Sequence, residues 1–89
     1  MVTAIILINV ERNKVNELAE QLAGMREISE VYSVSGNYDL IAIVRAENND
    51  ALAELVTNHL LKIEGITRTD TVLAFRAYSR HDLDAMFSV

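Results

Sequence analysis

Two short runs of nearly uninterrupted apolar residues constrain the fold of this chain more than any other feature. Residues 4–10 read Ala-Ile-Ile-Leu-Ile-Asn-Val, and residues 40–44 read Leu-Ile-Ala-Ile-Val. Both runs are rich in β-branched residues and far shorter than the about 20 residues that span a bilayer. They are also too short for typical helices. The pattern therefore predicts two buried β-strands.

Helical patterns alternate with these runs and with two further strands. Apolar residues recur at helical spacing over residues 15–23, with Asn13 placed as an N-cap and Gly24 as a C′ residue. A polar strand over residues 28–35 is predicted to reach the third strand through a tight turn at Gly36 and Asn37.

A second helix is predicted to start at Asn48 or Asn49 and to end at Gly65. A last strand follows over residues 71–78. The apolar face expected for this helix consists of Leu52, Leu55, Val56, His59, Leu60 and Ile63. We expect His59 to be an ordinary core or interface histidine rather than a ligand.

The resulting order, βαββαβ, predicts a fold of the α+β class. It matches the ferredoxin-like sandwich, in which an antiparallel sheet carries two helices on one face and the first and third strands are central. The two apolar runs occupy those central positions. Residues 1–79 are expected to form one domain, and residues 80–89 a C-terminal tail or a short helix.

The two apolar runs also lack the alternation of a sheet that is covered on one face only. Residues 5–8 and 40–44 are apolar at successive positions, so both faces of the central strands need cover. No spare segment is large enough to provide it. The sequence therefore predicts a homodimer in which two sheets face each other, with an apolar interface burying more than about 1,000 Å².

Charge and composition exclude several classes of function. The chain has 8 basic and 13 acidic residues, a net charge of −5, and no basic run, which argues against autonomous nucleic-acid binding. It has no cysteine, so disulfides and thiolate zinc sites are excluded. No cation precedes the first apolar run, which argues against a secretory signal. We expect a cytoplasmic protein that needs neither membrane nor cofactor.

Three local motifs resemble one known family. Residues 34–39 read V-S-G-N-Y-D, residues 63–66 read I-E-G-I, and residues 69–73 read T-D-T-V-L. They resemble the V-[TS]-G-x-Y-D turn and the G-[VI]-x-x-T-x-T strand entry of the RAM effector-binding domain of Lrp/AsnC transcriptional regulators. The resemblance covers about residues 3–79. Full-length members also carry an N-terminal helix-turn-helix, so the chain resembles a stand-alone RAM domain.

The resemblance implies that the chain senses a small molecule, most simply an amino acid, in the regulation of amino-acid metabolism. It also implies a dimer that assembles further, into a tetramer or octamer, and contact with full-length regulators. The turn offers backbone amides for a carboxylate, and two threonines two positions apart place their hydroxyls on one side of a strand. The expected ligand-binding residues are Ser35, Gly36, Asn37, Tyr38, Asp39, Thr69 and Thr71.

Two other functions remain open at this point. The chain could be an assembly-only partner of full-length regulators, without a ligand of its own. It could also be a small enzyme, because dimeric ferredoxin-like barrels host such chemistry. Enzymes of that kind need a buried acid, arginine or histidine in a roomy cavity. The expected sheet face is lined by Ile, Leu, Val and Ala, so no catalytic residue and no metal ligand is predicted.

Overall fold

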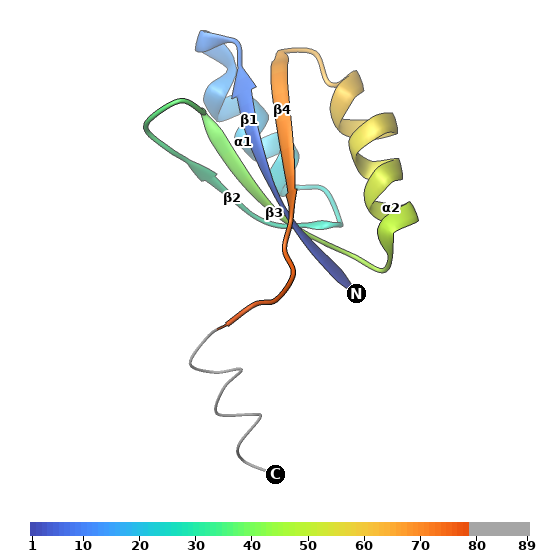
Figure 1. Ribbon diagram of the computed structural model, residues 1–89. Coiled ribbons are helices and arrows are strands. Elements are labelled where there is room, and N and C mark those ends of the chain that lie inside the picture. Colours follow the sequence, from blue (N-terminus) through green and yellow to red (C-terminus); the bar gives the residue numbers. More distant parts are fainter. Residues whose placement is uncertain (79–89) are drawn as a thin grey trace.

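The computed structural model describes residues 1–78; the tail or helix expected over residues 80–89 lies outside the described residues. The chain follows the predicted order of elements (Figure 1). The elements are β1 (Val2–Val10), α1 (Val15–Ala23), β2 (Ile28–Ser33), β3 (Leu40–Ala46), α2 (Asn49–Glu54) and β4 (Ile66–Leu73). A short 3₁₀ turn precedes α1, and a π turn and a 3₁₀ turn extend α2 to Lys62.

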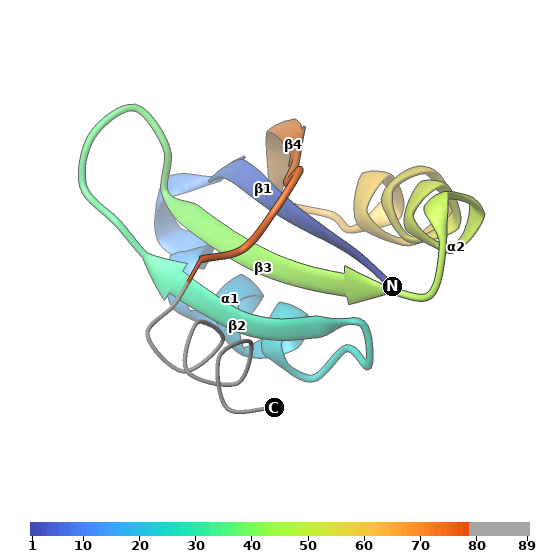
Figure 2. The same ribbon diagram turned by 60° about the horizontal axis from the view of Figure 1, so that its bottom comes forward.

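The sheet has the strand order β2-β3-β1-β4, and every neighbouring pair is antiparallel. The two apolar strands, β1 and β3, are therefore central, which confirms the prediction. Both helices lie on one side of the sheet, with α1 against β2 and β3 and α2 against β3 and β1 (Figure 2). This is the predicted ferredoxin-like arrangement.

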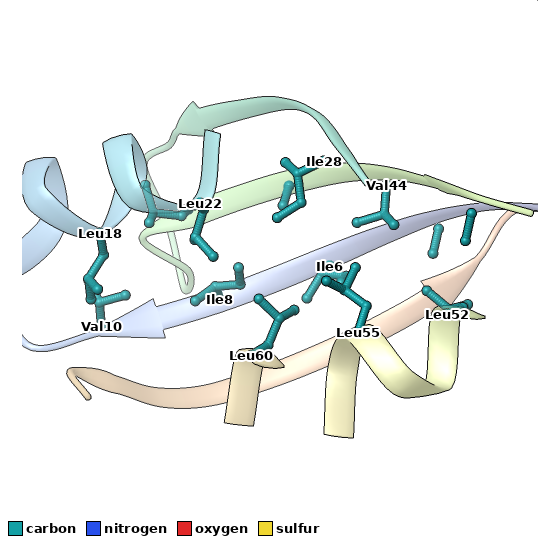
Figure 3. Packing of buried hydrophobic residues seen from close by; sticks show 14 residues of the cluster. Ile6, Ile8, Val10, Leu18, Leu22, Ile28, Val44, Leu52, Leu55 and Leu60 are labelled. Carbon is teal, nitrogen blue, oxygen red and sulfur yellow. The ribbon is translucent and has the colours of Figure 1, made fainter. Parts of the chain in front are cut away.

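The side chains of the central strands alternate between two faces of different character. On the helix-covered face, Ile6, Ile8 and Val44 have no exposed surface. They pack with Leu18 and Leu22 of α1. On the other side they pack with the leucines of α2 and its extension, which are Leu52, Leu55 and Leu60 (Figure 3). Burial of this apolar area is the main force that holds the layers together.

The other face carries the alternate residues of the same strands, and no described helix covers it. We call it the open face. Its central apolar residues are only partly buried, and none of them packs against the core cluster. These residues are Ile5 and Leu7 of β1 and Ile41 and Ile43 of β3. The predicted absence of alternation thus corresponds to two apolar faces, of which residues 1–78 cover one.

The second helix differs from its prediction at His59, which is exposed. The chain makes a π turn over Leu55–His59. In a π turn, residues five apart come to the same side, whereas an α-helix brings together residues four apart. Leu55 and Leu60 both face the core, with 2% and 0% of their surface exposed. His59 and Leu60 were both predicted on the apolar face; Leu60 lies there as predicted, whereas His59 does not belong to the core of its own chain, because the π turn changes which residues face the sheet.

Caps and turns match the prediction in part. Asn48 does cap α2, because its Oδ1 accepts from the amide of Ala51 at 2.8 Å. Gly65 has a φ of 103°, as expected for the residue that ends this segment. Asn13 caps nothing and lies in the 3₁₀ turn, and Gly24 has a helical φ of −80° rather than a left-handed one. The first helix therefore ends without the predicted C′ glycine.

Strand boundaries also differ from the prediction. The last strand occupies Ile66–Leu73, not residues 71–78, because its pairing with β1 runs from Val10–Ile66 to Ala4–Leu73. The turn between β2 and β3 is a loop over residues 34–39 rather than a two-residue turn, since β2 already ends at Ser33. Both differences follow from where the partner strands stop.

Candidate functional site

The loop over residues 34–39 closes on itself at one end of the sheet. The amide of Val34 donates to the carbonyl of Asp39 at 3.0 Å. Gly36 has a φ of 104°, a conformation that favours glycine, and open space lies where a side chain would start. Ser35, Gly36 and Asn37 are exposed at the tip of the loop. Within the described residues, the amides of Gly36 and Asn37 donate to no acceptor, so they remain available to an anion.

Three hydrogen bonds hold this loop against the end of β1. Asn9 Nδ2 donates to the carbonyl of Asn37 at 2.9 Å. The amide of Asp39 donates to the carbonyl of Ile8 at 2.9 Å, and Asp39 Oδ2 accepts from the amide of Val10 at 2.9 Å. One carboxylate oxygen of Asp39 thus satisfies a backbone amide of β1. Asp39 therefore has a structural role: it fixes the position of the loop against the end of β1.

Tyr38 reaches from the loop across the open face to β4. Its hydroxyl donates a hydrogen bond to Asp70 Oδ2. Arg68 Nη2 lies 3.3 Å from the same carboxylate oxygen, and the guanidinium carbon lies 5.9 Å from the centre of the Tyr38 ring. We call Tyr38, Arg68 and Asp70 the polar cluster. A phenol, a guanidinium and a carboxylate therefore meet beside the loop that carries the free amides.

The environment of Tyr38 changes its acidity. The hydrogen bond to Asp70 raises the pKa of Tyr38 above its ordinary value of 10.0, with a further rise from burial and from the negative charge of Asp70. The positive charge of Arg68 opposes this rise. Tyr38 therefore stays a neutral donor through the physiological range. The side chains of Asp70 and Arg68 are 42% and 65% exposed, so a ligand can reach both.

The two predicted threonines lie on the opposite face of β4. Thr69 pairs with Ile8 and Thr71 with Ile6, both of which point into the helix-covered core. Asp70 lies between them, opposite Leu7, and so points to the open face. Within one chain, the structure does not bring the threonine hydroxyls together with Tyr38.

Sequence reasoning missed Arg68 as a member of this site. The signal was present, because residues two apart on a strand share a face and Arg68 precedes Asp70 by two positions. It became usable only with the observed start of β4 at Ile66. The predicted strand began at residue 71 and left both residues outside it.

The polar cluster suits a ligand that carries both charges. A carboxylate is matched by a guanidinium and by free backbone amides, and an ammonium by a carboxylate. A metal fits poorly: residues 1–78 contain no group of three or more His, Asp or Glu side chains placed to hold an ion. In the same range, no helix is long and apolar enough to cross a membrane.

Comparison with known proteins gives the family. The Lrp/AsnC ligand-binding domain matches residues 3–83, so the chain belongs to this family. The HTH-type transcriptional regulator FL11 of Pyrococcus furiosus is 32% identical over 77 residues, covering 86% of this chain and 50% of that protein. The chain spans about half the length of the curated relatives that it matches.

Solved structures agree with this assignment. TTHA0845 from Thermus thermophilus is 48% identical, with a TM-score of 0.83 over 90% of this chain and 100% of that one. The transcriptional regulator NMB0573 from Neisseria meningitidis, solved as a complex with L-Met, shares the fold at 14% identity. Its TM-score is 0.80 over 89% of this chain and 53% of that one. The family is one of transcriptional regulators rather than of enzymes, so the enzyme alternative is not supported.

Proposed function

We propose that this chain binds a small zwitterionic metabolite, most simply an amino acid, and that binding changes how copies of the chain assemble. The polar cluster carries the proposal. It presents one cation, one anion and one neutral hydroxyl within reach of each other, and Tyr38 follows directly on Gly36 and Asn37, whose amides donate to no acceptor within the described residues. These are the groups that the two charged ends of an amino acid require.

Each group has an assigned role. Arg68 and the amides of Gly36 and Asn37 bind the ligand carboxylate, and Asp70 binds its ammonium. Tyr38 covers the ligand and keeps Asp70 in place through its hydroxyl. Thr69 and Thr71 face away from this cluster in their own chain, so they contribute only from a neighbouring copy.

Assembly is the second part of the proposal. The apolar residues of the open face are covered by the open face of a second copy, which gives a homodimer. Contacts between dimers then give a tetramer or octamer. A ligand shifts such an equilibrium only as far as it binds one assembly better than another. The fold neighbour solved with L-Met supports an amino acid as the ligand.

The chain by itself is not expected to bind duplex DNA. Its eight cations are outnumbered by thirteen acidic residues, and non-specific DNA binding depends on neutralising phosphates. Retention of random duplex by micromolar protein at physiological salt would contradict this part of the proposal.

A thermal-shift screen of the twenty amino acids, paired with measurement of the assembly mass, tests the proposal. A ligand at 100 times its Kd stabilises by about 2.7 kcal/mol, which a melting curve resolves. We expect Arg68→Gln and Asp70→Asn each to weaken binding at least about tenfold, and analogues without the carboxylate or the ammonium to fail.

Matched controls separate the site from general charge effects. Arg26→Gln removes another exposed cation, from the turn between α1 and β2, at the end of the sheet where β1 begins and opposite the polar cluster. It should leave ligand binding unchanged. If no amino acid shifts the melting temperature at millimolar concentration while the assembly persists, the assembly-only alternative replaces the sensing proposal. The partly buried apolar residues of the open face are what favour that alternative.

A further inference from the structure

The segment after β4 exposes large apolar side chains to an unusual degree. Phe75 is 98% exposed and Tyr78 is 74% exposed. The amide of Ala74 donates to the carbonyl of Thr3 at 2.9 Å, and residues 75–78 belong to no helix or strand. Figure 1 shows the chain leaving the sheet here, at the end where β1 begins. We call residues 74–78 the arm.

The described part of the chain offers the arm no cover. Single exposed apolar residues are normal, but a nearly fully exposed phenylalanine and an exposed tyrosine within four positions put two uncovered aromatic rings on one short segment. Val72, which precedes the arm on the open face, is also 48% exposed. The arm therefore follows directly on a strand that presents an uncovered apolar side chain on the open face.

We propose that the arm is a docking element through which each copy of the chain binds the open face of a second copy, with Phe75 and Tyr78 as its anchors. The proposal rests on the two-copy assembly proposed above and adds a contact that sheet-to-sheet packing alone does not include. Each copy has both parts, a projecting arm and an uncovered apolar face. A two-fold arrangement therefore satisfies both copies at once.

The area involved agrees with a second copy as the occupant. An aromatic side chain buries about 150–250 Å², so the two anchors of both copies together supply about 600–1,000 Å². Stable, specific interfaces bury about 1,200–2,000 Å² in total. The arms thus supply about half of what a stable dimer needs, and the partly buried Ile5, Leu7, Ile41 and Ile43 of the two open faces add further apolar area. Aromatic anchors of this kind are typical interface hot spots.

The dimer dissociation constant, measured by analytical ultracentrifugation, tests the arm. We expect Phe75→Ser to raise this constant at least tenfold, while the far-ultraviolet circular dichroism stays unchanged because Phe75 touches almost nothing in its own chain. Leu61→Ser is the matched control. Leu61 is 60% exposed, but it lies on the turn that follows α2, away from the open face. Its replacement should leave the dissociation constant within twofold of the wild type.

The outcomes separate this inference from the assembly on which it rests. Suppose that Ile5→Asp raises the dimer dissociation constant while Phe75→Ser, like Leu61→Ser, leaves it unchanged. The dimer with facing sheets is then supported, and the arm proposal is wrong. A wild-type chain that is monomeric at micromolar concentration defeats both.

Photo-crosslinking gives a second, independent readout. Phe75 is replaced by benzoylphenylalanine in the full chain, and isotopically light and heavy copies are mixed before irradiation. Crosslinked peptides that join light to heavy chains at β1, β2 or β3 support the proposal. Crosslinks confined to one isotope, which arise when the arm folds back on its own chain, overturn it.

Discussion

The two faces of the sheet are made by alternate residues of the same strands, yet they differ in how much of them the chain buries. Ile6 and Ile8 on the helix-covered face are fully buried, whereas Ile5 and Leu7 between them are only partly buried. Their chemistry is nearly identical. Two short helices can cover one face of a four-stranded sheet but not both, so residues 1–78 leave the second face uncovered.

The difference also separates stability from function. The helix-covered face holds hydrophobic side chains and no buried polar group within the described residues. The open face carries the same kind of apolar centre, but it adds the polar cluster and the loop that holds it. We infer that the first face stabilises the fold and that the second carries recognition.

The largest expected effect is that of Ile6→Asp. Ile6 has no exposed surface, and a carboxylate there would be buried without a partner. We expect a loss of about 4 kcal/mol or more in the free energy of unfolding, enough to unfold many small domains. Circular dichroism and urea titration measure it. A soluble, cooperatively folding Ile6→Asp protein would show that the two faces are not as different as their burial indicates.

Ile5→Asp is the neighbouring test on the open face. Ile5 is only partly buried and pairs with Ile43 and Val72, not with the core. We expect a folded chain whose dimer dissociation constant rises about 100-fold, which corresponds to about 2.7 kcal/mol. Sedimentation velocity gives the mass. Equal loss of folding in Ile5→Asp and Ile6→Asp would contradict the division between the faces.

The two glycines with positive φ give a smaller contrast. Gly65 has a φ of 103°, and a Cβ there would lie 3.0 Å from Leu18 Cδ1 and from Lys14 Cδ on the helix side. Gly36 has a φ of 104°, but its Cβ would enter open space. We expect Gly65→Ala to cost about 2–3 kcal/mol and Gly36→Ala about 1 kcal/mol. Thermal melts compare them, and a greater loss in Gly36→Ala would place the tighter packing at the loop instead.

The smallest expected effect is a pH dependence from the polar cluster. A pKa that is raised in the folded state means that folding favours neutral Tyr38. This contribution is present below the unfolded pKa of about 10 and disappears as pH rises through the higher folded value. Tyr38→Phe should remove this contribution. The difference in free energy of unfolding between the wild type and Tyr38→Phe should therefore become smaller at alkaline pH.

Urea titrations of the wild type and of Tyr38→Phe on both sides of about pH 10 measure this narrowing. The comparison with Tyr38→Phe is needed because the pKa of Tyr32 is also raised, by its hydrogen bond to Glu30. A difference that stays constant with pH would mean that the Tyr38–Asp70 bond does not contribute to folding.

Much of the fold was predictable because its signals are local. The β-branched runs identified the central strands, Asn48 identified the start of α2, and Gly65 identified the end of its extension. Apolar residues at successive positions also predicted that both faces of the sheet would be apolar. These features depend on residues that are close in sequence, where propensity and periodicity act directly.

Only the tertiary structure decided which side chains meet. Tyr38 and Asp70 are 32 residues apart, and they touch because β1 pairs with both β3 and β4 while the loop folds over the end of β1. The register of β4 put Asp70 on the open face and turned Thr69 and Thr71 to the other. The π turn left Leu60 in the core and turned His59 to the surface. A one-residue change in register or helical turn moves a side chain to another face, and long-range pairing and packing fix that choice.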